Sequence, residues 1–158
     1  MRALAMRVGR RLKAKKRLLV SAESCTGGWV AQVVTSIPGS SAWFERGFVT
    51  YSNAAKRELL GVKAATLKKH GAVSEETARE MARGALARST GNLALAVTGI
   101  AGPGGGSRDK PVGTVCFAWV YKKQLRSETR RFPGDRESVR RKSVVRALQG
   151  VLESLAGG

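Results

Sequence analysis

Residues 18–28 read Leu-Leu-Val-Ser-Ala-Glu-Ser-Cys-Thr-Gly-Gly, and this stretch indicates the fold class. It begins with a short apolar run typical of a buried strand, and hydroxyls and glycines follow shortly after. Residues 93–107 repeat the pattern, because the run Leu-Ala-Leu-Ala-Val is followed by Thr-Gly-Ile-Ala-Gly-Pro-Gly-Gly-Gly-Ser. Glycine-rich loops after strand ends are where α/β proteins build small-molecule sites. Two such loops predict one site with two walls, although either alone also fits an ordinary glycine turn.

Helix and strand patterns alternate outward from these loops. Apolar spacing and cap residues predict helices over 3–16, 54–60, 64–70 and about 135–155, one that begins at an N-cap at Thr26, and one that begins at Ser74. Strands are predicted over 17–23, 43–51, 93–97, 112–121 and 125–132. The alternation predicts an α/β fold, a three-layer α/β/α sandwich with a mixed sheet. The length of 158 residues favours a single domain over residues 1–158.

The net charge of +18 is extreme, and eight of the first 17 residues are Lys or Arg. Such a field attracts phosphorylated metabolites, nucleic acid or an acidic membrane surface, and it also fits a highly solvated surface. No apolar stretch approaches the about 20 residues of a membrane span, and no signal core follows the basic N-terminus. Two cysteines in different elements fit a cytoplasmic protein without a metal or other cofactor.

Few residues remain as candidates for catalysis. The second glycine loop lacks the Gly-Lys-Ser/Thr ending of a Walker motif, and the single histidine, His70, argues against a Ser-His-Asp triad. Ser41 precedes Lys56 by fifteen residues. A lysine can deprotonate a serine when burial or nearby positive charge lowers the lysine pKa, so this pair is a weak candidate on spacing alone.

The chain resembles the C-terminal domain of the CinA family, in the form that acts as a separate nicotinamide-nucleotide amidase. The resemblance runs from about residue 20 to 152. It rests on residues 22–28 (Ala-Glu-Ser-Cys-Thr-Gly-Gly), 39–53 (Gly-Ser-Ser-Ala-Trp-Phe-Glu-Arg-Gly-Phe-Val-Thr-Tyr-Ser-Asn) with Lys56, 71–74 (Gly-Ala-Val-Ser), 99–107 and 110–115 (Lys-Pro-Val-Gly-Thr-Val). It implies hydrolysis of the carboxamide of nicotinamide mononucleotide to nicotinic acid mononucleotide and ammonia.

The resemblance also orders the candidate residues. It implies Ser41 as nucleophile, Lys56 beside it as base, and Tyr51 and Thr98 as further catalytic residues. Candidates for substrate binding are Glu23, Ser24, Thr26, Gly27, Gly28, Gly99, Gly102, Arg136 and Arg140. Glu23 is expected to pair with a cation or with substrate, and the two arginines with phosphate. Ser24, Thr26 and Thr98 stay rivals for the nucleophile, whereas Cys25 fits a small buried core residue.

Two other classes of function stay open, a nucleotide-binding domain without catalysis and a basic protein associated with nucleic acid. A pure binder does not need a lysine near a serine, and a nucleic-acid binder does not need two glycine loops. No motif that reads a specific nucleic-acid sequence is present. The expected partners are therefore nicotinamide mononucleotide and, from the resemblance, a second copy in a homodimer, with no membrane and no specific nucleic acid.

Overall fold

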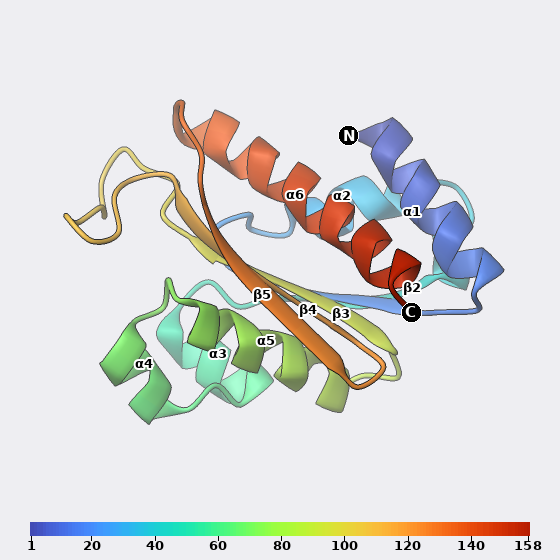
Figure 1. Ribbon diagram of the computed structural model, residues 1–158, viewed down its shortest axis with the longest axis horizontal. Coiled ribbons are helices and arrows are strands. Elements are labelled where there is room, and N and C mark those ends of the chain that lie inside the picture. Colours follow the sequence, from blue (N-terminus) through green and yellow to red (C-terminus); the bar gives the residue numbers. More distant parts are fainter.

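A computed structural model describes residues 1–158 as a five-stranded sheet with helices on both faces (Figure 1). The strands are β1 (Leu19–Glu23), β2 (Phe44–Val49), β3 (Leu93–Gly99), β4 (Thr114–Tyr121) and β5 (Gln124–Arg131). The helices are α1 (Arg2–Ala14), α2 (Trp29–Thr35), α3 (Asn53–Leu60), α4 (Ala64–His70), α5 (Glu75–Ala87) and α6 (Arg136–Ala156), with a short 3-10 helix, η1 (Ser40–Ala42), before β2. Every predicted helix and strand is present, so the predicted three-layer α/β/α sandwich with a mixed sheet is confirmed.

The strand order is β2-β1-β3-β4-β5. β1 runs parallel to β2 and β3, whereas β4 runs antiparallel to β3 and β5. Parallel neighbours require crossover connections, which α2 and then α3 to α5 supply. The carboxyl ends of β1, β2 and β3 therefore meet at one edge of the sheet. The start of β4 lies at the same edge, and α6 begins beside it because Thr114 pairs with Arg131 at the end of β5.

Helices α1, α2 and α6 cover one face of the sheet, and α3, α4 and α5 cover the other (Figure 1). All eight residues of β4 are buried between these layers. On the α5 face the strands present small residues such as Ala94, Ala96 and Ala118, which let α5 pack closely. Gly84 of α5 lies against the end of α3, where a Cβ would collide with the Leu60 carbonyl. This close packing fixes α3 beside the sheet edge. No helix has both the length and the apolar character that a membrane crossing requires.

Candidate active site

The loop after β1 holds a serine in a fixed position at the sheet edge. The Ser24 N–H donates to the Val97 carbonyl at 2.9 Å, which extends the pairing of β1 with β3 by one residue. The Gly27 N–H donates back to the Ser24 carbonyl at 3.0 Å. Gly27 and Gly28 take φ angles of +60° and +97°, which would strain any other side chain. The two glycines therefore let the chain turn into α2 while Ser24 stays at the edge.

Glu23 is buried, and its carboxylate caps α2. It accepts hydrogen bonds from Thr26 Oγ1 at 2.6 Å and from the N–H groups of Val30 and Ala31 at 2.8 and 3.1 Å. N–H groups in the first turn of a helix have no acceptor within the helix, so the acid satisfies two of them. Burial raises the pKa of Glu23, and these hydrogen bonds oppose the rise.

Two expectations are corrected by this geometry. Thr26 is not the N-cap residue of α2, because the helix begins at Trp29 after Gly28, and the Thr26 hydroxyl donates to Glu23 instead. Glu23 does not pair with a cation, since its oxygens are already engaged by Thr26 and the helix. Both residues build the turn that presents Ser24.

Lys56 projects from α3 into a buried position beside Ser24. The Ser52 hydroxyl accepts from the Ala55 N–H at 3.0 Å and caps the helix, as predicted. Lys56 is only 1% exposed. Its Nζ lies 3.0 Å from Ser24 Oγ, 3.0 Å from the Thr50 carbonyl and 3.1 Å from the Tyr51 carbonyl. Burial lowers the pKa of Lys56, and no carboxylate opposes that effect.

Lys56 Nζ has three contacts, all with oxygen atoms that can accept a hydrogen bond. A neutral amine has two N–H groups and one lone pair, whereas an ammonium group has three donors and no acceptor. Here Nζ donates to the Thr50 and Tyr51 carbonyls and to Ser24 Oγ, and the Ser24 hydroxyl donates to the Tyr51 carbonyl at 3.4 Å. In the neutral form the two carbonyls can hold both N–H groups, and the lone pair then faces Ser24 Oγ. The arrangement can therefore draw a proton from Ser24, which is the chemistry of a lysine-activated serine.

Ser41 does not lie beside Lys56, so the expected pairing of these two residues is wrong. Ser41 is exposed in η1, before the amino end of β2, whereas Lys56 contacts the main chain just past its carboxyl end. The six residues of β2, at about 3.3 Å each, separate these ends by about 20 Å. The parallel pairing of β1 with β2 instead brings the loop after β1, with Ser24, beside the lysine.

The two other catalytic candidates, Tyr51 and Thr98, have side chains that do not contact Lys56, and Cys25 is a buried core residue as expected. The Tyr51 side chain is 63% exposed, so only the main chain of this residue contacts Lys56. Thr98 is buried, and its hydroxyl donates to the Ala72 carbonyl at 2.8 Å, where it holds the segment before α5. Cys25 is buried, and burial raises the pKa of its thiol to about 12. The thiol therefore stays protonated near neutral pH.

The loop after β3 packs closely against the start of β4. A Cβ on Gly99 would lie 2.8 Å from Val115 Cγ2 and 3.0 Å from the Thr114 carbonyl oxygen, so any larger residue here would force its neighbours to shift. Gly102 takes a φ of +86°, and its carbonyl accepts a hydrogen bond from Arg136 at 2.8 Å. These two glycines shape the backbone of the second loop and tie it to α6.

Arg136 and Arg140, both predicted to bind substrate, line a cavity of about 410 Å³ together with Trp29 and Glu137. We call it the arginine cavity. Arg140 donates to two carbonyls of the loop after β1, at 3.1 Å each. The structure thus brings both arginines to the loop that carries Ser24. Trp29, which also lines the cavity, was not among the predicted site residues.

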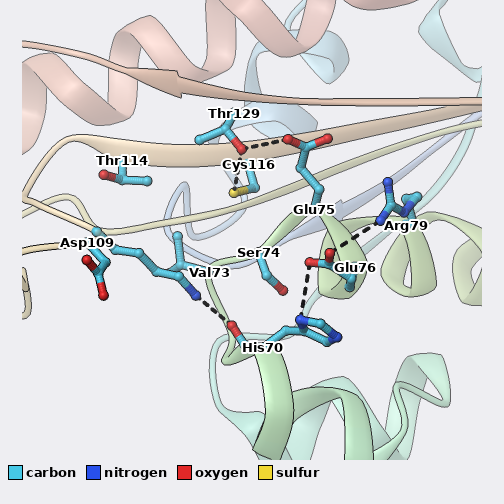
Figure 2. Close-up of a pocket in the computed structure, with 11 residues that line it drawn as sticks. His70, Val73, Ser74, Glu75, Glu76, Arg79, Asp109, Thr114, Cys116 and Thr129 are labelled. Atoms are coloured by element: carbon cyan, nitrogen blue, oxygen red, sulfur yellow. Dashed lines mark hydrogen bonds and ion pairs between the residues drawn. The ribbon is translucent and has the colours of Figure 1, made fainter.

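A second cavity, of about 460 Å³, lies between β4, β5 and the start of α5, and we call it the α5 cavity (Figure 2). Two of its three acids, Glu75 and Glu76, have side-chain partners within the protein. Glu75 accepts from the hydroxyls of Ser127 and Thr129 at 2.8 and 2.9 Å. Glu76 lies 3.8 Å from His70 Nδ1 and 3.6 Å from Arg79. No group of three or more His, Cys, Asp or Glu side chains is placed to hold a metal ion.

The family model described as the CinA C-terminal domain matches residues 1–155. The nicotinamide-nucleotide amidohydrolase PncC of Escherichia coli K12 is 56% identical over 150 residues, which cover 92% of this chain and 89% of that protein. The protein of that name from Pseudomonas putida is 52% identical and covers 95% of this chain and 94% of its own length.

A solved structure shares the whole fold. The competence/damage inducible protein CihA of Agrobacterium tumefaciens superposes with a TM-score of 0.95 at 46% identity, over 97% of this chain and 94% of that one. Both the fold and the sequence of this chain therefore match known proteins. The chain belongs to the CinA C-terminal domain family.

Proposed function

We propose that this chain hydrolyses the carboxamide of nicotinamide mononucleotide to nicotinic acid mononucleotide and ammonia, with Ser24 as nucleophile and Lys56 as base. The names of the relatives supply the reaction. One observation carries the assignment of residues: a buried lysine without a carboxylate partner holds its Nζ 3.0 Å from the Ser24 hydroxyl oxygen. Such a pair is the activated nucleophile that cleavage of an unreactive amide requires.

In the first step Ser24 Oγ attacks the carboxamide carbon, and its proton passes to the lone pair of Lys56 Nζ. The Thr50 and Tyr51 carbonyls, which hold the other two N–H groups, keep the amine aimed at Ser24. They also stabilise the ammonium that forms, because both are acceptors. Lys56 thus needs no carboxylate to orient it.

The oxygen of the amide becomes negatively charged in the tetrahedral intermediate and needs donors. The main-chain N–H groups of Cys25 and Thr26, which follow the nucleophile directly, have no acceptor within the protein. Donors of this kind, placed where charge develops, make a large contribution to acyl-transfer catalysis. We assign the oxyanion to these two N–H groups.

The intermediate then collapses. Lys56 returns its proton to the amide nitrogen, the C–N bond breaks, and ammonia leaves an acyl ester on Ser24. A water molecule gives a proton to neutral Lys56 and attacks the ester. Lys56 then returns this proton to Ser24 Oγ as the ester bond breaks, which releases the carboxylic acid and restores the Ser24 hydroxyl. Each step moves a proton through Lys56, so the same amine serves as base and acid in turn.

The test is product analysis with the purified protein and nicotinamide mononucleotide. We expect nicotinic acid mononucleotide and ammonia in equal amounts, measured by liquid chromatography and by a coupled ammonia assay. A Ser24→Ala preparation purified in the same way controls for contaminating amidases. Release of free nicotinamide instead of ammonia would overturn the proposal, because it means cleavage of the glycosidic bond.

Assembly as a homodimer, a single-domain organisation and a cytoplasmic location remain predictions from the sequence and the family resemblance. Analytical ultracentrifugation of the purified chain measures the first of these directly.

A further inference from the structure

The outer face of α1 carries positive charge that the protein does not neutralise. Eight of the first 17 residues are Lys or Arg, and the first acid of the chain is Glu23. Glu23 is buried and caps α2, so it does not offset this charge. No ion pair of the chain includes a residue before Glu45. The exposed cations of α1 therefore have no acidic partner within the protein.

The opposite face of α1 is anchored in the core. Ala5, Val8 and Leu12 are fully buried, and α1 packs against α2 and α6. Gly9 lies so close to Trp43 that a Cβ at this position would come within 2.6 Å of the indole ring. The basic face is therefore presented on a fixed helix, and a ligand that binds there does not have to order the main chain.

Three arginines of this face, Arg7, Arg10 and Arg11, line a cavity of about 550 Å³ between α1 and the end of α6. We call it the α1 cavity. Leu152 and Ala156 complete its lining, so no acid faces the three guanidinium groups. Like charges three or four residues apart on a helix repel each other. A bound anion relieves this repulsion, and the α1 cavity thus indicates an anionic ligand.

An acidic membrane does not fit this face. A helix that lies in a membrane interface inserts an apolar face between the lipids. The apolar stripe of α1 is already buried against the protein, and Met6 is the only large apolar side chain that α1 exposes. The helix therefore lacks the apolar surface that such binding requires.

A protein partner fits no better. The centres of protein interfaces are rich in aromatic side chains and poor in charge. Residues 1–17 contain eight cations and no aromatic residue. The same absence disfavours single-stranded nucleic acid, which stacks its bases on aromatic side chains.

The phosphate backbone of a nucleic-acid duplex matches the remaining features. It offers regularly spaced negative charges, and lysine and arginine contact it without reading the sequence. The 13 residues of α1 span about 20 Å, a length that reaches several phosphates. A rigid, basic helix without aromatic side chains supplies these contacts alone.

We propose that the outer face of α1, centred on Arg7, Arg10 and Arg11, binds the phosphate backbone of a nucleic-acid duplex without sequence preference. This surface is separate from the proposed active site. None of the three arginines lines the arginine cavity or the α5 cavity. The inference therefore does not depend on the proposed reaction.

The test uses the α1 triple variant, in which Arg7→Gln, Arg10→Gln and Arg11→Gln are combined. Fluorescence anisotropy measures binding to a labelled DNA duplex of about 20 base pairs and to an RNA duplex of the same sequence, at about 50 to 200 mM salt. We expect the variant to bind about tenfold or more weakly than wild type. The slope of log K against log salt should become shallower by about 3, one for each lost phosphate contact.

The matched control removes the same net charge from the other face of the sheet. It combines Arg57→Gln, Lys68→Gln and Lys69→Gln, which are exposed positions of α3 and α4 (Figure 1). We expect this control to bind either duplex within about twofold of wild type, because contacts rather than net charge carry the affinity. Equal losses in the two triple variants would overturn the proposal, since net charge alone would then explain the binding.

The remaining outcomes also decide the question. A loss in the α1 triple variant with either duplex supports the proposal, and the duplex that wild type binds more tightly identifies the source of the backbone. No binding of wild type to either duplex overturns it, as does tighter binding to a single strand. Tighter binding to phosphatidylcholine vesicles with about 30% phosphatidylserine would assign the surface to membranes instead and also overturn the proposal.

Amidase activity separates this inference from the proposed function. The α1 triple variant should release ammonia from nicotinamide mononucleotide within about twofold of wild type, as exposed substitutions away from a site do, which also shows that its fold is intact. If wild type binds a duplex through α1 but releases no ammonia, the α1 surface stands and the proposed function fails.

Discussion

The arginine cavity and the α5 cavity lie at the same edge of the sheet, but they differ in whether their charged side chains have partners of opposite charge. In the α5 cavity, Glu76 faces His70 and Arg79, so its charge is balanced within the protein. In the arginine cavity, Arg136 and Arg140 have carbonyls as partners but no acid. The α5 cavity is the larger of the two, at about 460 against 410 Å³. We therefore expect the unbalanced positive charge beside Ser24 and Lys56, rather than the cavity volume, to mark the active site.

The largest effect is expected when the buried amine is removed. Lys56→Ala and Lys56→Met should each lower kcat about 1,000-fold or more, because no base remains for Ser24. Lys56→Arg should fail as well, since a guanidinium stays protonated. Ammonia release from nicotinamide mononucleotide measures the loss. Arg57→Ala, at the exposed neighbouring position on α3, is the control and should keep wild-type activity.

Circular dichroism and thermal unfolding of the same variants show whether the fold is intact, and Lys56→Met keeps most of the buried volume. A folded Lys56→Met that retains more than about a tenth of wild-type kcat would contradict the role of the lysine, since loss of a general base costs about a hundredfold or more.

The pH dependence of the reaction follows from the same amine. Burial lowers the pKa of Lys56 from its ordinary value of 10.5, and only the neutral form has a lone pair. We expect kcat/KM to rise with pH through this lowered pKa and to fall about tenfold per pH unit below it. Arg57→Ala should show the same profile. A rate that rises only above pH 10.5 would mean that burial does not tune this lysine.

A smaller effect, on stability, is expected from the cap of α2. Glu23→Gln replaces one acceptor oxygen by an NH₂ group that faces helix N–H donors, so we expect a loss of about 1–3 kcal/mol in the free energy of unfolding. Urea unfolding measures it. Glu58→Gln, on the exposed side of α3, is the matched control and should stay within about 0.5 kcal/mol. Equal stability of the two variants would show that the Glu23 cap contributes nothing.

The smallest effect is expected in the α5 cavity. Glu76→Gln should leave kcat and KM within about twofold of wild type and cost about 0.5 kcal/mol or less at pH 7. A hydrogen bond from the main-chain N–H of Glu76 itself lowers the pKa of its carboxyl group from 4.5. The nearby charges of His70 and Arg79 lower it further, by smaller amounts. Its contribution is therefore present above pH 4.5 and is lost as the pH falls through the lowered value.

Urea unfolding at pH 7 and at pH 3 should accordingly show a difference between wild type and Glu76→Gln that shrinks at the lower pH. A large loss of activity in Glu76→Gln would contradict the expected difference between the two cavities, because it would mean that the α5 cavity takes part in the reaction.

The fold was predictable because each element carries its own local signal. The cap residues Ser52 and Ser74, with the apolar stripes behind them, place α3 and α5 where the structure has them. The prediction of Thr26 as the N-cap of α2 was wrong for a physical reason. A hydroxyl before an apolar helix is normally its cap, but here the buried Glu23 supplies a stronger, charged acceptor to the same N–H groups.

The site was only partly predictable. Lys56 was a candidate from the sequence, but the serine that lies beside it could not be predicted, because the distance along the chain says nothing about which strand ends meet. Ser41 is closer to Lys56 in sequence, whereas Ser24 is closer in space because β1 and β2 are parallel. The signal that could have separated them is the rule that small-molecule sites form at the carboxyl ends of parallel strands.

The most direct test of the account compares the two serines. Ammonia release from nicotinamide mononucleotide is measured for Ser24→Ala and for Ser41→Ala, each checked for folding by circular dichroism. With Ser24 as nucleophile, we expect Ser24→Ala to lose about 10,000-fold or more in kcat. Ser41→Ala should stay within about twofold of wild type, as exposed substitutions away from a site do. The reverse result, with Ser41→Ala inactive and Ser24→Ala retaining more than about a tenth of wild-type kcat, would contradict the assignment.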